Sequence, residues 1–251
     1  MRLKAQGIVL RDYKLDEDRV VTILTREQGV LSAYANGANR LRSALASSTE
    51  LLCYGQFELF KNRDRYVVDH ADAQRTFFGI RQDVEKLSLA SYFAQLSTEL
   101  TPREEPADMY LSLLLNTLHF VENEKRDPQL LKALYELRIL TLSGYMPALV
   151  ACRRCGVYQA EEFFFFPADG TLLCGGCAGG QRPVGGIPLR MGVLAAMRHI
   201  IYCPPEKLFA FSLSGEGLGE LERLAEQYLH YQVEKTFHAL EIYRALRPMT
   251  E

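Results

Sequence analysis

The sequence predicts an α+β protein, in which a small N-terminal β-barrel or sandwich precedes a mostly α-helical domain that carries a zinc-ribbon-like module of four cysteines. Three observations support this fold class. The first part of the chain holds short apolar runs separated by turn-forming residues, the remainder shows helical spacing, and two C-x-x-C pairs interrupt the helical part. The expected divisions are residues 1–79 for the barrel, 80–148 and 188–251 for the two parts of the helical domain, and 149–187 for the cysteine module.

The composition is that of a globular protein with enough apolar material for a core, since 48% of the 251 residues are hydrophobic and 24% are charged. The formal net charge of −2 means that any contact with nucleic acid must come from a local basic patch. No apolar run approaches the roughly 18–20 residues that span a membrane, and the N-terminal stretch lacks the apolar core of an export signal. We therefore expect a cytoplasmic protein without a membrane partner, whose thiols stay reduced.

Five apolar runs in the N-terminal part indicate short β-strands, and turn-forming residues separate them. A short helix is expected within residues 38–48, between the third and fourth runs. The regular spacing of the strands is typical of a small barrel or sandwich. The five runs are Ile8–Leu10, Val20–Leu24, Val30–Tyr34, Leu51–Phe60 and Tyr66–Val68.

Helical periodicity begins after Gly79, where apolar residues from Leu89 to Leu100 fall on one face of a predicted helix that Pro102 should end. Most such stripes are core faces and carry no function of their own. Further helices are expected over residues 109–121, from an N-cap at Asp127, from Pro188 onward and over residues 217–246.

Four cysteines form two pairs, Cys152 with Cys155 and Cys174 with Cys177. Each C-x-x-C turn delivers two sulfurs, and two facing turns complete the tetrahedron that zinc prefers. The spacing C-x2-C-x18-C-x2-C lies within the range of zinc sites, and the segment between the pairs reads as a strand, a turn and a second strand. Because thiolates fill all four positions, we expect one structural zinc ion without a catalytic role.

Redox-active thiols are the alternative interpretation of these cysteines, and a single C-x-x-C pair would favour it more than two pairs do. The remaining cysteines, Cys53 and Cys203, lack partners at ligand spacing and are interpreted as core residues.

No enzyme motif stands out in the sequence. A P-loop, a G-x-S-x-G elbow and an H-E-x-x-H helix are all missing, and the five histidines are scattered. We therefore expect a binding or scaffolding protein and not an enzyme.

Positive charge gathers at the N-terminal end. Residues 1–81 contain 13 Lys and Arg against 10 Asp and Glu, a net charge of +3 in a chain whose total is −2. Basic side chains beside Tyr13, Tyr34 and Tyr66 suit a groove that follows a nucleic-acid strand, although such a charge is also typical of ordinary surface. The candidate DNA-binding residues are Lys4, Arg11, Lys14, Arg19, Arg40, Arg42, Lys61, Arg63 and Arg65.

Two stretches resemble the RecO family of recombination mediator proteins. The first begins with the G-I-V-L strand at Gly7–Leu10 and continues with the D-x-x-V-T-x-x-T strand at Asp18–Thr25, Gly29 and the small-G-A-x-R loop at Asn36–Arg40. The second, LRILTLSGYMPALVACRRCG, matches the family's L-x-x-x-G-Y-x-P helix end before the first cysteine pair. The resemblance covers most of the chain, in the order barrel, helices, cysteine module, helices.

This resemblance implies that the N-terminal barrel is an OB-fold and that the helical domain carries the zinc module. It also implies binding of single- and double-stranded DNA, annealing of complementary strands and loading of recombinase onto coated single strands, in the cytoplasm at the nucleoid. The implied partners are RecR and the C-terminal tail of the single-stranded-DNA-binding protein. A zinc-ribbon adaptor that binds only proteins is the alternative function, and an enzyme with an unusual site is a third.

Overall fold

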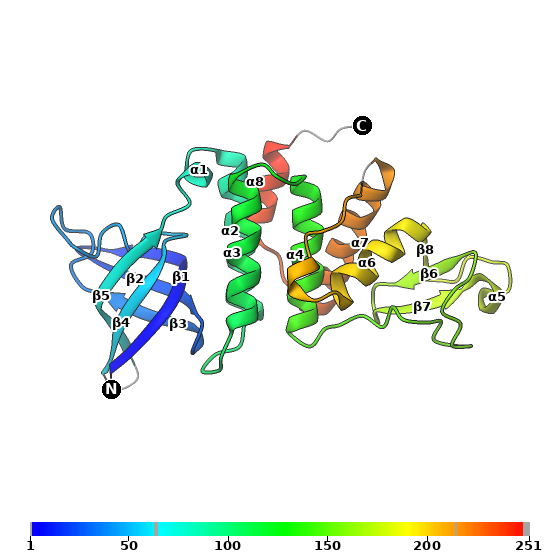
Figure 1. The fold of residues 1–251 in the computed structure, drawn as a ribbon, viewed down its shortest axis with the longest axis horizontal. Helices are drawn as coiled ribbons and strands as arrows, with labels where there is room; N and C mark the ends of the chain where they lie inside the picture. Colours follow the sequence, from blue (N-terminus) through cyan, green and yellow to red (C-terminus); the bar gives the residue numbers. More distant parts are fainter. Residues whose placement is uncertain (1, 63–64, 214, 248–251) are drawn as a thin grey trace. The chain divides into compact units, whose positions relative to one another are not determined.

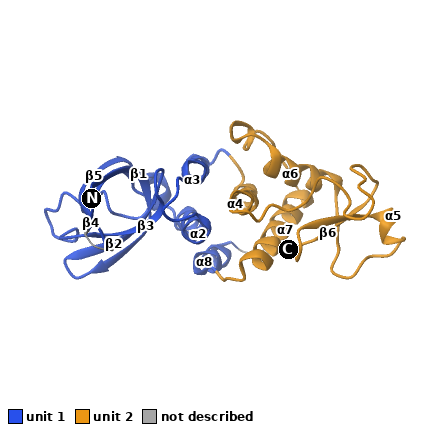
Figure 2. Cartoon of the chain, turned by 90° about the horizontal axis from the view of Figure 1, so that it is seen from below, with its two compact units in different colours: residues 1–125, 237–251 blue, residues 126–236 orange. Residues whose placement is uncertain are grey.

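The computed structural model describes residues 2–62, 65–213 and 215–247, and it divides the chain into two compact units. The first unit comprises residues 1–125 together with 237–251, and the second comprises residues 126–236 (Figure 2). The last helix of the chain therefore belongs to the unit that contains the barrel. In the described part of the chain no helix has both the length and the apolarity to cross a membrane.

Five strands of the first unit form a closed barrel in the order β1-β2-β3-β5-β4 (Figure 1). All neighbouring strands are antiparallel except β3 and β5, which run parallel. A closed five-stranded barrel of this order is an OB-fold, so the expected fold class is confirmed. The strands are β1 (Arg2–Leu15), β2 (Asp18–Thr25), β3 (Gly29–Ala35), β4 (Tyr54–Asn62) and β5 (Arg65–Arg75).

Alternating side chains fill the barrel. Phe57 and Leu59 on β4 are each 1% exposed, and they point into a core that also holds Val21 and Ile23 from β2. Gly55 lets two strands meet closely at this point, because a Cβ there would lie 2.1 Å from the carbonyl oxygen of Asp72.

The expected short helix within residues 38–48 is wrong. Residues 36–53 form consecutive turns, in which Arg40 N–H donates to the carbonyl of Gly37 and Ser43 N–H donates to that of Arg40. The buried guanidinium of Arg19 donates to the Ala46 carbonyl at 2.9 Å and thus takes a backbone acceptor of this segment. A long-range side-chain contact of this kind overrides local helix propensity.

Three helices follow the barrel in the first unit, and α8 returns to them from the end of the chain. Asp83 caps α2 by accepting hydrogen bonds from the N–H groups of Glu85 and Lys86. The ring of Phe237, just before α8, packs edge-on against Tyr92 of α2 at 5.7 Å. The helices are α1 (Phe78–Arg81), α2 (Val84–Leu100), α3 (Asp108–Glu122) and α8 (His238–Leu246).

The second unit combines helices with a three-stranded sheet in the order β7-β6-β8. The predicted cap at Asp127 is confirmed, because its carboxylate accepts from the N–H of Gln129 at 2.8 Å. The elements are α4 (Pro128–Leu142), β6 (Phe163–Phe166), β7 (Thr171–Cys174), α5 (Gly175–Ala178), β8 (Ile187–Leu189), α6 (Met191–Tyr202), the 3-10 helix η1 (Pro205–Lys207) and α7 (Glu216–Val233).

The prediction that Pro188 opens a helix is wrong, because Pro188 lies in β8 and α6 begins at Met191. Pro188 pairs with Phe164 at the edge of the sheet. An edge strand tolerates proline because its outer side needs no N–H donor.

Candidate functional site

The four predicted cysteines come together in one cluster. Cys152 and Cys155 lie in the loop after α4, Cys174 ends β7, and Cys177 lies in α5. Their sulfur atoms all lie within 4.8 Å of one another, and the Sγ atoms of Cys155 and Cys174 are 3.7 Å apart. The hairpin that joins the pairs is the predicted one, with β6 antiparallel to β7.

These distances fit a four-coordinate metal ion. A tetrahedron with zinc–sulfur bonds of about 2.3 Å places its sulfur atoms about 3.8 Å apart. The donor set is entirely thiolate, which suits zinc and other thiophilic ions and leaves no ligand position open. The cluster can therefore hold a metal ion in a closed site.

Backbone N–H groups favour a thiolate at Cys152. Burial alone would raise the pKa of Cys152, but hydrogen bonds from the backbone N–H groups of Cys155, Cys174 and Arg154 outweigh it and lower the pKa to about 6. The side chains of Cys155 and Cys174 raise the pKa of Cys177 to about 12 through hydrogen bonds with its thiol. A bound cation would favour ionisation of all four thiols.

Arg198 of α6 fastens the first cysteine loop to the helices of the second unit. Its guanidinium donates to the carbonyl oxygens of Leu149 at 2.7 Å, Val150 at 3.0 Å and Tyr158 at 3.1 Å. It also lies over the Tyr158 ring, with 4.3 Å between the guanidinium carbon and the ring centroid. Sequence reasoning missed Arg198, because nothing in a helical arginine signals contact with a distant loop.

Helix α7 holds the hairpin from the other side. The Tyr228 hydroxyl donates to the carbonyl of Tyr145 at 3.0 Å, and its ring packs edge-on against Phe165 of β6. Gly170 at the hairpin turn has a φ of 67°, and a Cβ there would lie 2.9 Å from the Tyr228 hydroxyl. The cysteine module is therefore packed against the helices of its own unit.

The outer face of the barrel carries a row of exposed and half-exposed side chains. The strand registers pair Tyr13 with Val20, Val20 with Tyr34, Tyr34 with Val67 and Val67 with Phe60. Paired residues of a sheet share a face, and both ends of this row are open, since Tyr13 is 57% exposed and Phe60 is 43% exposed. Phe60 and Leu41 are exposed apolar residues that sequence reasoning missed.

Cationic side chains lie over two aromatic rings at the β4–β5 end of the barrel. The Arg65 guanidinium lies 5.5 Å from the centroid of Tyr34, and Lys61 Nζ lies 5.2 Å from that of Tyr66. The Arg65–Tyr34 pair presents a ring and a charge side by side, as a strand of bases and phosphates requires, whereas Tyr66 packs against the barrel core.

The nine basic residues predicted to bind DNA are placed differently from one another. Arg11, Lys14 and Arg42 are exposed, with no carboxylate in ion-pair range among the residues that the structure describes. Lys4 and Arg40 are exposed but paired, Lys4 with Glu58 at 2.7 Å and Arg40 with Glu17. Arg63 lies outside the described residues.

Arg19 is placed inside the protein, where it is 4% exposed. Its guanidinium donates to Asn39 Oδ1 at 3.1 Å and to Thr49 Oγ1 at 3.0 Å, in addition to the Ala46 carbonyl. Arg19 thus anchors the turns of residues 36–53 and does not face solvent. A charged residue in a short strand is expected to lie at the surface, so the sequence did not predict that Arg19 is buried.

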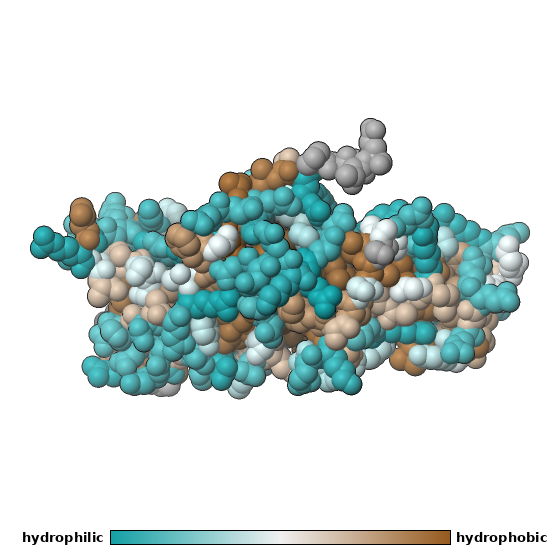
Figure 3. Space-filling view, turned by 45° about the horizontal axis from the view of Figure 1, so that its top comes forward, coloured by the Kyte–Doolittle hydropathy of each residue, from teal (hydrophilic) through white to brown (hydrophobic). Residues whose placement is uncertain are grey.

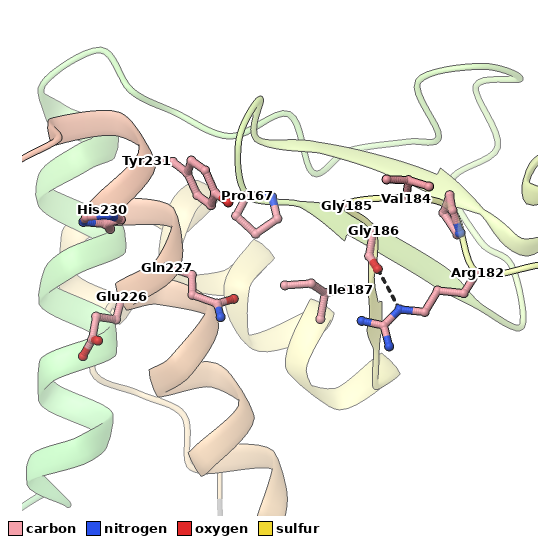
Figure 4. Close-up of a pocket in the computed structure, with 11 residues that line it drawn as sticks. Pro167, Arg182, Val184, Gly185, Gly186, Ile187, Glu226, Gln227, His230 and Tyr231 are labelled. Carbon is pink, nitrogen blue, oxygen red and sulfur yellow. Dashed lines mark hydrogen bonds between the residues drawn. The ribbon is translucent and has the colours of Figure 1, made fainter.

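The second unit also contains a pocket of about 620 Å³ between α7 and the segment before β8, lined by both apolar and polar side chains. Figure 4 shows Tyr231 and Gln227 on the helix side, Pro167 above, and Ile187 and Val184 opposite. Arg182 rims the pocket and is held by a hydrogen bond of 3.1 Å from its Nε to the Gly186 carbonyl. Glu226 turns away from the pocket in this view.

Two family models match this chain, and together they cover most of it. The description "Recombination protein O N terminal" matches residues 1–77, and "Recombination protein O C terminal" matches residues 81–241. The "DNA repair protein RecO" of Acetivibrio thermocellus is 31% identical over 245 residues, covering 97% of each chain. That of Symbiobacterium thermophilum is 31% identical and covers 96% of each chain, and that of Anaeromyxobacter dehalogenans is 37% identical and covers 79%. The chain therefore belongs to the RecO family.

Proposed function

We propose that this protein is a DNA repair and recombination mediator. It binds single- and double-stranded DNA on the outer face of the barrel, anneals complementary strands and helps to load recombinase onto coated single strands, without catalysing a reaction. The observation that carries the proposal is the outer row from Tyr13 to Phe60, which holds three aromatic rings and has Arg65 over the ring of Tyr34, in a chain of the RecO family. This work takes place in the cytoplasm, at the nucleoid.

The mechanism is electrostatic and independent of sequence. Lysine and arginine neutralise phosphates and release counterions, while exposed rings stack on bases of any kind. Two strands that share one cationic surface repel each other less, which favours their pairing. Arg19 is left out of this surface because it is buried.

Zinc is the metal that we propose for the cysteine cluster, with Cys152, Cys155, Cys174 and Cys177 as its ligands. The ion would cross-link the loop after α4 to the hairpin. Its contribution is to folding, because the closed site offers no position for a substrate.

The proposed protein partners are RecR and the tail of the single-stranded-DNA-binding protein. An acidic, apolar tail requires apolar contacts beside a cation, and the pocket offers Pro167, Val184 and Ile187 with Arg182 at its rim. Arg182→Ala should therefore weaken binding of a fluorescent tail peptide, while Arg244→Ala on α8 of the first unit should leave it unchanged. Equal effects of the two changes would remove this pocket from the proposal.

A salt series tests the DNA site. Of the nine predicted DNA-binding residues, five are described and lack a carboxylate in ion-pair range. If each neutralises one phosphate of a single strand, log Kd should change with log salt by a slope of about 3.5. Replacing two of them should reduce the slope by about 1.4 and weaken binding at low salt. The five cations are Arg11, Lys14, Arg42, Lys61 and Arg65.

The test variant is Arg42→Ala/Arg65→Ala, and the matched control is Lys207→Ala/Arg223→Ala, which removes the same charge from the second unit. Fluorescence anisotropy of labelled single-stranded DNA gives Kd at each salt concentration. An equal loss of slope in both variants would show that the barrel is not the specific DNA-binding site. Failure of the unaltered protein to bind at low salt would favour the alternative, an adaptor that binds only proteins through its zinc ribbon.

A further inference from the structure

A tight turn presents one leucine to solvent between two arginines. The N–H of Ser43 donates to the carbonyl of Arg40 at 3.0 Å and closes a turn whose two central residues are Leu41 and Arg42. Central turn positions usually carry small or polar residues, because they face water. Leu41 is nevertheless fully exposed, at 105%, and both neighbouring arginines are exposed as well.

The turn is held by contacts at its base. Gly37 N–H donates to the carboxylate of Asp18 at 2.6 Å, and Asn39 N–H donates to the carbonyl of Glu17 at 2.9 Å. The buried Arg19 binds Asn39 as well. Because these contacts order the backbone beforehand, burying the tip in a partner costs little conformational entropy.

The chemistry of the tip indicates what it meets. Figure 3 shows apolar areas set among hydrophilic residues on the face that it draws. A partner that suits an apolar point beside the exposed charge of Arg42 has an anionic exterior and an apolar interior. DNA has both, with phosphates outside and stacked bases within.

We propose that Leu41 is a wedge that inserts between stacked bases of DNA bound to the barrel, while Arg42 contacts a flanking phosphate and Arg40, which is paired with Glu17, supports the turn. The proposal rests on the proposed function and deepens it, since it assigns to one residue the separation of stacked bases. Proteins that insert leucine between base steps unstack them locally. A strand with its bases unstacked is free of self-structure and is ready to pair with its complement.

The experiment uses the full-length protein and a single-stranded oligonucleotide with 2-aminopurine at several positions, whose fluorescence rises when its stacking is lost. Three variants change the tip: Leu41→Ala removes the wedge, Leu41→Phe retains it, and Leu41→Lys replaces it with a third cation. Leu15→Ala is the matched control, because Leu15 is an exposed leucine, at 46%, at the end of β1 in the same barrel. Anisotropy of the same oligonucleotide gives the affinity of each protein.

We expect the unaltered protein, Leu41→Phe and Leu15→Ala to raise the fluorescence at saturation. Leu41→Ala should bind within about threefold of the unaltered protein, because its arginines are intact, and should lose most of the rise. Leu41→Lys should bind DNA at least as tightly as the unaltered protein and should also lose the fluorescence rise. If the tip acted only through its charge, tight binding and the fluorescence rise would not be separated in this way.

A full fluorescence rise with Leu41→Ala or Leu41→Lys would overturn the wedge and leave DNA binding in place. Binding by the unaltered protein without any rise would overturn it equally. If the unaltered protein does not bind the oligonucleotide, the proposed function and the wedge both fail. Loss of capture on anionic lipid vesicles in Leu41→Lys, with the fluorescence rise kept, would assign the tip to a membrane surface instead.

Discussion

Removal of the Arg198 side chain should destabilise the second unit and loosen its metal site. Arg198→Ala leaves three carbonyl groups without their donor, of which that of Leu149 belongs to a fully buried residue. The cost of a buried polar group without a partner is about 1–3 kcal/mol. The carbonyls of Val150 and Tyr158 belong to exposed residues and regain water, so each loses only about 0.5 kcal/mol.

Loss of the stacking on Tyr158 adds about 0.5–1 kcal/mol, because the pair is partly exposed. The expected fall in the free energy of unfolding is therefore about 4 kcal/mol, within a range of roughly 2.5–5 kcal/mol. Arg198→Lys keeps one cationic donor that reaches one carbonyl, so it should recover about half of the loss.

Urea unfolding of the zinc-loaded protein, followed by circular dichroism, measures this free energy. A competition assay with a chromophoric chelator measures zinc affinity, which should fall because the first cysteine loop loses its support. The control is Arg223→Ala, an exposed arginine of α7 in the same unit. A loss below about 1 kcal/mol with unchanged zinc affinity would show that Arg198 does not hold the cysteine loop.

Three further predictions concern buried charges and the metal. Lys132 is 1% exposed, and its Nζ lies 2.9 Å from Glu136 and 2.8 Å from Glu226. Lys132→Met should therefore lower the free energy of unfolding, measured in urea, by about 3–5 kcal/mol, because it leaves buried carboxylates without a partner. The double variant Lys132→Met/Glu136→Met should regain most of this loss. Burial lowers the pKa of Lys132, but both carboxylates outweigh it and raise the pKa above 10.5. The stabilisation by this group is therefore complete at neutral pH and lost only as pH rises through the raised pKa, which a stability profile at alkaline pH would check against the double variant. Arg19→Ala should lower the free energy of unfolding by about 3 kcal/mol and increase proteolysis within residues 36–53, because that segment loses its anchor; a resistant segment would contradict this. Cys155→Ser should reduce bound zinc, measured by elemental analysis, to a small fraction of one ion per chain. The affinity for single-stranded DNA should change by less than about twofold. Full zinc occupancy in this variant would refute the four-cysteine site.

Local sequence was sufficient wherever neighbours along the chain do the work. The C-x-x-C turns place two sulfurs each within a few residues, and the N-cap at Asp127 acts on a group two residues away. The five strands of the barrel were also predictable, because alternation and turn residues are local signals.

Other features depended on contacts between distant residues. The helix expected within residues 38–48 is replaced by turns, because Arg19 takes up acceptors of that segment from another strand. Pro188 is accommodated by its place at a sheet edge, which no local pattern indicates.

The sequence by itself determined the fold class, the four cysteines that could hold a metal ion and the family, because spacing and motif are properties of the linear chain. Only the tertiary structure decided which side chains face water. The charged Arg19 and Lys132 are buried among partners from other elements, while the apolar Leu41 is exposed on a turn. The reason is physical. Burial depends on the partners that long-range packing brings to a side chain. The residues next to an arginine or a leucine in the sequence do not indicate which partners those are.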